Sequence, residues 1–203
     1  MNKLPSRDIE SLWNLYENIT NKLDDKNIKI IVEELGQRIA EQSMSQRTNE
    51  PFCGIGGLLE YSLELAKTAK KLNEALDLKL NNLKIMKLAL LSEIGRIGDH
   101  TNSRFVETTS DWHKEKLGQY YDWNEACPKF KVRDMSLWIL QRYNVQLTWD
   151  EWLTLNHLGD IEGNDKSFYT KEKSPLSMCL LMAQDIVYTK ENERIKREKV
   201  LPF

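Results

Sequence analysis

Cysteine and histidine are scarce in this sequence, with three of each among 203 residues. Cys53, Cys127 and Cys179 are odd in number and form no C-x-x-C pair, which argues against a disulfide framework. A few isolated thiols are typical of proteins in a reducing compartment. We therefore expect three free, buried cysteines and a cytoplasmic protein.

The chain also lacks a strong net charge and a long apolar run. Lysine and arginine (29) nearly balance aspartate and glutamate (31), which leaves a formal net charge of -2. Because such a chain has no global field for a polyanion, neither genomic DNA nor an anionic membrane is expected as a partner, and any phosphate must be bound locally. No apolar stretch approaches the ~20 residues that cross a bilayer, and no signal-peptide pattern opens the sequence. We expect a soluble protein that does not enter a membrane.

Alternating strand patterns, internal repeats and domain linkers are absent as well. Apolar residues recur instead at helical spacing, which predicts an all-α fold with one core. We expect a single domain, 1–203, with an N-terminal extension at 1–50 and a helical core at 54–198. Core helices are expected near 58–76, 83–95, 134–143, 148–157 and 176–197, and amphipathic helices near 6–23 and 28–39 in the extension.

The connections between these helices and the role of the extension are less well defined by the sequence. Residues 99–110 and 158–174 have no apolar periodicity and are expected to be loops, and a short helix is expected near 112–121. The two N-terminal helices either cover the core or pair with a second subunit to form a homo-oligomer. The sequence leaves both possibilities open.

Residues 83–99 are expected to form the central helix, because apolar side chains fill every side of its middle. Asn81 is a suitable N-cap, and Gly95 and Gly98 can adopt the left-handed conformation that ends a helix. Polar side chains gather at that end, beside an apolar core, where side chains can be held in place for chemistry. They are Ser92, Glu93, Arg96 and Asp99.

Two motifs resemble a known family. Gly-Gly-Leu-Leu-Glu-Tyr-Ser-Leu at 56–63 and Ala-Leu-Leu-Ser-Glu-Ile-Gly-Arg-Ile-Gly-Asp at 89–99 resemble segments of the HD-domain metal-dependent phosphohydrolases. Residues 111–116, 134–137 and 147–152 resemble a phage-encoded branch of that superfamily, so the likeness covers about 54–193. It implies an HD-like helical bundle, a hydrolytic metal site and, for a phage protein, the host cytoplasm as location.

The resemblance also indicates that the metal site has been lost. Tyr61 stands where the family has its first metal-binding histidine, and Ser92 and Glu93 replace the His-Asp pair. A phenol, with a pKa of about 10, and a hydroxyl are poor metal ligands at neutral pH. Asp185 matches the family's distant aspartate, and His157 lies near its middle histidines. We therefore expect no metal and no cofactor. If catalytic activity remained, the candidate catalytic residues would be Glu93, His157 and Asp185.

These residues also have simpler interpretations. A buried glutamate needs a partner, and Arg96, one helical turn after Glu93, is the obvious candidate for a structural ion pair. Asp185 can cap or pair within the bundle, and a lone histidine such as His157 is often a hydrogen-bonded core residue.

The segment from Trp112 to Tyr120 combines aromatic and basic residues, which can stack a nucleobase and pair with its phosphate. The same rings can equally be core residues, with the lysines in solvent. If the segment faces the end of the central helix, a cleft lies between them. The expected ligand-binding residues are then Tyr61, Ser92, Glu93, Arg96, Arg104, Trp112, His113, Lys114, Lys116, Tyr120 and Asp185.

Three functions remain open at this stage. The first is a catalytically inactive protein that binds a nucleotide or small phosphorylated ligand in the former cleft, for example a phage protein that sequesters a nucleotide signal of host immunity. The second is a residual metal-dependent phosphohydrolase acting on nucleotides. The third is a protein-interaction module without a small ligand.

Overall fold

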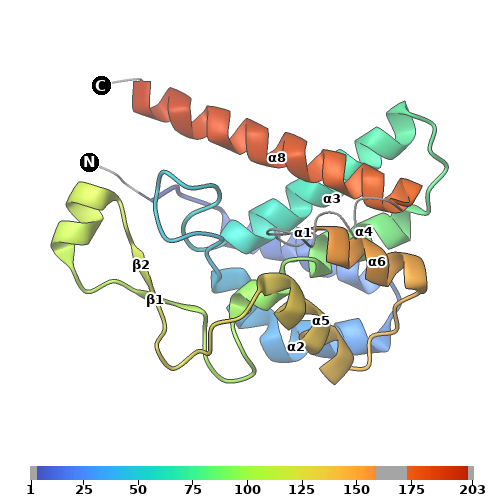
Figure 1. The fold of residues 1–203 in the computed structure, drawn as a ribbon, viewed down its shortest axis with the longest axis horizontal. Helices are drawn as coiled ribbons and strands as arrows, with labels where there is room; N and C mark the ends of the chain where they lie inside the picture. Colours follow the sequence, from blue (N-terminus) through green and yellow to red (C-terminus); the bar gives the residue numbers. More distant parts are fainter. Residues whose placement is uncertain (1–3, 159–172, 201–203) are drawn as a thin grey trace.

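Helices make up most of the computed structural model, which describes residues 4–158 and 173–200 (Figure 1). The all-α prediction is confirmed. The α-helices are α1 (Ile9–Lys22), α2 (Lys26–Glu41), α3 (Gly57–Ala75), α4 (Asn82–Leu91), α5 (Val132–Arg142), α6 (Trp149–Leu158) and α8 (Pro175–Val200). Two short helical turns, η1 (Ile94–Ile97) and η2 (His113–Leu117), and two strands, β1 (Phe105–Glu107) and β2 (Tyr121–Trp123), complete the described elements.

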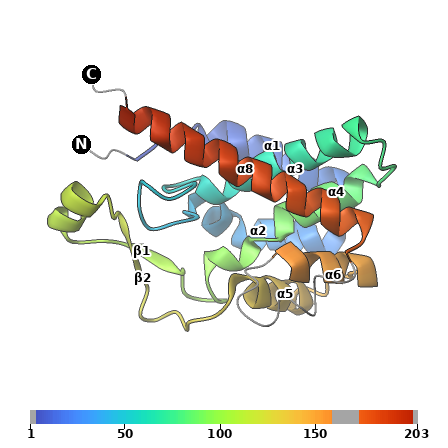
Figure 2. The same ribbon diagram turned by 45° about the horizontal axis from the view of Figure 1, so that its top comes forward.

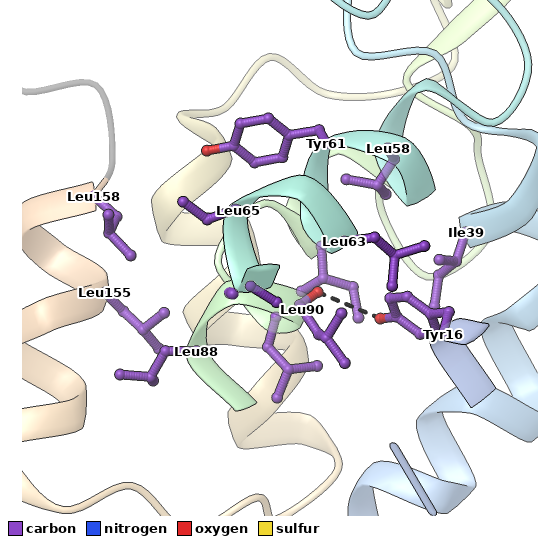
Figure 3. Packing of buried hydrophobic residues seen from close by; sticks show 14 of the residues in the cluster. Tyr16, Ile39, Leu58, Tyr61, Leu63, Leu65, Leu88, Leu90, Leu155 and Leu158 are labelled. Atoms are coloured by element: carbon purple, nitrogen blue, oxygen red, sulfur yellow. Dashed lines mark hydrogen bonds between the residues drawn. The ribbon is translucent and has the colours of Figure 1, made fainter. Parts of the chain in front are cut away.

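The core lies around α3 and α4, in agreement with the expectation that the central helix lies within residues 83–99. Helix α3 packs against both α4 and α8, and α6 packs on α8, which crosses one side of the bundle in both ribbon views (Figures 1 and 2). Leu88 and Leu90 of α4 are almost fully buried (Figure 3). The Tyr16 hydroxyl donates to the Leu90 carbonyl oxygen at 3.3 Å, which joins α1 to this helix.

The N-terminal helices cover the core, as one of the two expectations proposed. Helices α1 and α2 both pack against α3, and the side chains of Ile28, Ile31 and Ile39 are buried there. The cap of α1 is Asp8, whose carboxylate accepts the Ser11 amide, so the helix begins at Ile9 and not near residue 6 as expected. On its outer side α1 borders, with α3, a groove of about 520 Å³, and pairing of these helices with a second subunit stays a prediction.

The central helix begins as expected and ends earlier. Asn81 caps it by accepting the Leu83 amide at 2.8 Å, but α4 stops at Leu91 and a 3-10 turn follows. Gly98 has a φ of +100°, in keeping with its expected role. The same expectation for Gly95 is wrong, because Gly95 lies within the 3-10 turn. Its missing side chain leaves room for α5: a Cβ there would lie 2.3 Å from the Val132 carbonyl oxygen.

Two expectations about residues 99–124 are wrong. The sequence predicted no strand, but β1 and β2 pair antiparallel, with Val106 opposite Asp122. The expected helix at 112–121 is only the short turn η2, and its last expected residue, Tyr121, belongs to β2. Three-residue strands are too short to show an alternating pattern, so apolar periodicity could not predict them.

The remaining expectations about composition can be checked directly. All three cysteines are free and buried, as predicted. In the described part of the chain, no helix has the length and apolar character needed to cross a membrane. The expected loop at 158–174 lies almost wholly outside the described residues.

Candidate functional site

Glu93 and Arg96 form a buried ion pair directly after α4. The Arg96 Nε donates to Glu93 Oε2 at 2.6 Å, and Arg96 Nη1 donates to the Met44 carbonyl oxygen at 2.9 Å. Burial by itself lowers the pKa of the Arg96 guanidinium, but the Glu93 carboxylate more than offsets this and raises the pKa above its ordinary value. The structural interpretation of Glu93 is therefore confirmed, and Arg96 carries its charge at any ordinary pH.

Tyr61 lies on α3 with its ring completely buried. The rings of Phe52 and Tyr188 pack against it, with centroids at 5.5 and 5.4 Å, and its hydroxyl oxygen accepts a hydrogen bond from Gln184 Nε2 at 3.0 Å. Burial, followed by the neighbouring Tyr188 and Glu93, raises the pKa of Tyr61 well above 10. The phenol therefore stays protonated and cannot supply the anionic oxygen that a metal ion would need.

Ser92 takes part in the joint between α4 and α5. Its hydroxyl donates to the Ala89 carbonyl oxygen at 3.4 Å, within its own helix. Its carbonyl oxygen accepts from the Ser136 hydroxyl at 2.8 Å, and the same hydroxyl accepts the Gly95 amide at 2.9 Å. Ser136 thus holds the 3-10 turn that positions Glu93 and Arg96. Sequence reasoning missed this residue, because nothing local marks a serine whose partners lie more than 40 positions away.

Gln184, and not Asp185, is the residue of α8 that hydrogen-bonds to Tyr61. Gln184 donates to Tyr61, whereas Asp185 is exposed to solvent. The structure therefore does not bring Asp185, one of the expected ligand-binding residues, into contact with Tyr61 or Glu93. Ala183 and Val187 are buried, and this sets the rotation of α8 that places Gln184 toward α3.

His157 belongs to a separate hydrogen-bonded group between α6 and α8. Its Nδ1 lies 3.0 Å from the Ser177 hydroxyl, which lies 2.8 Å from the Thr154 hydroxyl. All three side chains are buried, so the histidine joins two helices as a core residue would. Among residues 4–158 and 173–200, no three His, Cys, Asp or Glu side chains group closely enough to hold a metal ion.

The basic and aromatic residues expected to face this site lie on a separate projection, residues 104–124, which we call the arm. Arg104 stacks among aromatic rings, with its guanidinium carbon 4.5 Å from the Trp123 ring centre and 5.6 Å from that of Phe130. The arm extends to one side of the bundle (Figures 1 and 2). No residue of η2 is buried, and the Trp112 ring contacts His113.

The expected cleft is covered by the loop at 42–56 instead of facing the arm. This loop places Met44 on Arg96 and Phe52 on Tyr61. Phe52 has a φ of +54°, which is uncommon for a non-glycine residue, and its amide donates to Glu191 Oε1 at 3.3 Å. Sequence reasoning had no signal for this cover, because the contacts join α3, α8 and the η1 turn to a loop without periodicity.

Fold and site together define a mostly helical protein whose polar centre is internally paired. Comparison of the chain with models of protein families, with curated proteins and with solved structures gave no match.

Proposed function

We propose that this chain is a catalytically inactive, HD-like protein that binds a nucleotide or another small phosphorylated ligand. One observation carries the proposal: the side chains of Tyr61 and Glu93, at positions where the HD-domain family has metal ligands, form hydrogen bonds to other side chains of this protein. Tyr61 is paired with Gln184, and Glu93 is paired with Arg96. Loss of ligands together with retention of the surrounding helices favours binding over hydrolysis.

Arg96 is the cation best suited to a phosphate in the bundle. Its charge is fixed by Glu93, and 15% of its side chain remains exposed. A phosphate at that exposed edge would gain a charge-assisted hydrogen bond, while the Glu93 carboxylate can accept hydrogen bonds from a sugar or base. Trp112 and Lys116 lie on the arm and not beside Arg96, so the proposed site rests on Arg96 and Glu93.

The biological role that we propose follows from the resemblance to a phage-encoded branch. A phage protein of this kind would lower the free concentration of a nucleotide signal of host immunity by binding it. Binding without turnover suffices for this role when the protein is in excess over the signal.

Calorimetric titration with a panel of linear and cyclic nucleotides tests the proposal. Glu93→Gln/Arg96→Met, which removes the cation without leaving the buried Glu93 carboxylate unpaired, is expected to weaken phosphate binding by about 2–5 kcal/mol, as for the loss of a desolvated charge contact. Lys116→Ala should change affinity little and mainly alter its salt dependence, and Arg104→Ala and His113→Ala test the rest of the arm. Arg142→Ala, an arginine on α5 next to Trp138, is the control.

The titration distinguishes the remaining functions. If no nucleotide binds, or if all four variants stay folded and keep full affinity, the proposed ligand site is wrong. Release of phosphate by the wild-type protein in the presence of added divalent metal would instead support the residual phosphohydrolase.

The likeness to the phosphohydrolases can be tested by rebuilding the metal site. Tyr61→His, Ser92→His and Glu93→Asp would restore three of the family's ligands, and we propose Gln184→Asp as the fourth, because Gln184 contacts Tyr61. The fourfold variant is expected to gain affinity for a divalent transition metal relative to the threefold variant, measured by metal content after dialysis. Equal metal content in both would contradict the placement of Gln184 at the ligand position.

A further inference from the structure

The outer surface of the arm is unusually apolar. Val106, Trp112 and Leu117 are large hydrophobic side chains with exposed fractions between 40% and 57%. Single exposed apolar residues are ordinary on a protein surface, but these three belong to one projection of 21 residues, 104–124. Such a concentration marks an interaction surface.

Backbone hydrogen bonds to the loop at 42–56 attach one side of the arm to the rest of the protein. The Thr48 amide donates to the Gly118 carbonyl oxygen at 2.9 Å, and the Tyr120 amide donates to the Gln46 carbonyl oxygen at 3.0 Å. On that side Tyr121 is buried. A two-stranded hairpin is at best marginally stable by itself, so the attached side supports the arm while its other side is left to contact a partner.

The charges on the arm match a second arm better than they match a strongly charged partner. Three cations, Arg104, Lys114 and Lys116, stand against four anions, Glu107, Asp111, Glu115 and Asp122. The two lysines are in the η2 turn, whereas Glu107 ends β1 and Asp111 precedes the turn. Within the described residues none of Glu107, Asp111, Lys114 and Lys116 forms an ion pair with another side chain.

We propose that the arm is a dimerisation element, in which the arms of two copies of this chain pair antiparallel about a twofold axis. Trp112 and Leu117 of one copy pack on the hairpin of the other, near its Val106, and the lysines of each turn face the acidic residues beside the opposite hairpin. Because the interface is isologous, each of these contacts occurs twice. Dimerisation does not require the proposed ligand, although Trp112, Lys114 and Lys116 are also among the expected ligand-binding residues, so pairing is measured without nucleotide.

Analytical ultracentrifugation without nucleotide tests the pairing. The wild-type chain is expected to be a dimer, and Trp112→Ser/Leu117→Ser should raise the dimer dissociation constant by more than about 100-fold, since two apolar contacts are lost twice. Trp149→Ser is the matched control: it removes an even more exposed tryptophan, 73% exposed, from α6 outside the arm. This control should stay dimeric. Unchanged far-UV circular dichroism shows that each variant is folded.

A charge exchange tests the antiparallel register. Lys114→Glu/Lys116→Glu and Glu107→Lys/Asp111→Lys each place like charges opposite one another, so each alone should dimerise at least about tenfold more weakly. Mixing the two should restore a heterodimer of wild-type affinity. A monomeric wild-type chain, or a dimer that the arm variants leave unchanged, overturns the proposal, and failure of the mixture to associate overturns the antiparallel register.

Discussion

Replacement of Arg96 by alanine is expected to be strongly destabilising, because it leaves the Glu93 carboxylate buried without its partner. Glu93 is 5% exposed, and its only described ion-pair partner is Arg96, at 2.6 Å. Removing one member of a buried ion pair costs about 3–5 kcal/mol. The Met44 carbonyl oxygen also loses its donor, which adds on the order of 1 kcal/mol. We expect a total of about 4–6 kcal/mol.

Urea unfolding followed by circular dichroism measures this loss, with two comparison variants. Glu93→Gln/Arg96→Met removes both charges and should recover most of the stability, to within about 2 kcal/mol of wild type, because no uncompensated charge remains. Lys67→Ala breaks the Lys67–Glu64 pair, which has the same i,i+3 spacing but is exposed, and should cost only about 0–1 kcal/mol.

The stabilities of the single and double variants together show whether an unpaired Glu93 carboxylate causes the loss. If Arg96→Ala costs no more than Lys67→Ala, Glu93 is not held by Arg96 in the way the structure indicates. If the double variant is as unstable as Arg96→Ala, the loss comes from packing and not from an unpaired charge.

Three further predictions concern local features. Gly95→Ala should destabilise by at least about 1–3 kcal/mol in urea unfolding, because the added Cβ would lie 2.3 Å from the Val132 carbonyl oxygen; an unchanged midpoint would contradict this close packing. Asn81→Ala should cost about 1 kcal/mol through loss of the α4 cap, and Asn81→Ser should restore most of it. Burial raises the pKa of the Glu191 carboxyl, but the Arg194 side chain offsets this and lowers the pKa below its ordinary 4.5. The ionised Glu191 carboxylate therefore stabilises the fold fully above about pH 5, and this stabilisation is lost as the pH falls through the folded-state pKa. Glu191→Gln should make the melting temperature fall less steeply in acid, and an unchanged slope would contradict this prediction.

Features with a local cause could be predicted from the sequence. Asn81 was identified as a cap because an amide side chain at that position satisfies free amides of the first helical turn. The Glu93–Arg96 pair was foreseeable because the two residues are one turn apart beside apolar neighbours, where a buried charge needs a partner. Apolar periodicity likewise predicted each of the long helices, although it placed the end of α4 four residues too late.

Features that depend on distant partners were decided only by the tertiary structure. The choice between Gln184 and Asp185 depends on the rotation of α8 against α3, since neighbouring residues of a helix differ by about 100°. Ser136 and Met44 acquire their roles from partners about 40 to 50 positions away, and such contacts have no sequence period. The loop at 42–56 covers the Glu93–Arg96 pair, and the arm projects to one side of the bundle. Backbone hydrogen bonds outside helices and strands hold the loop against the arm, and such bonds leave no pattern in the order of the side chains.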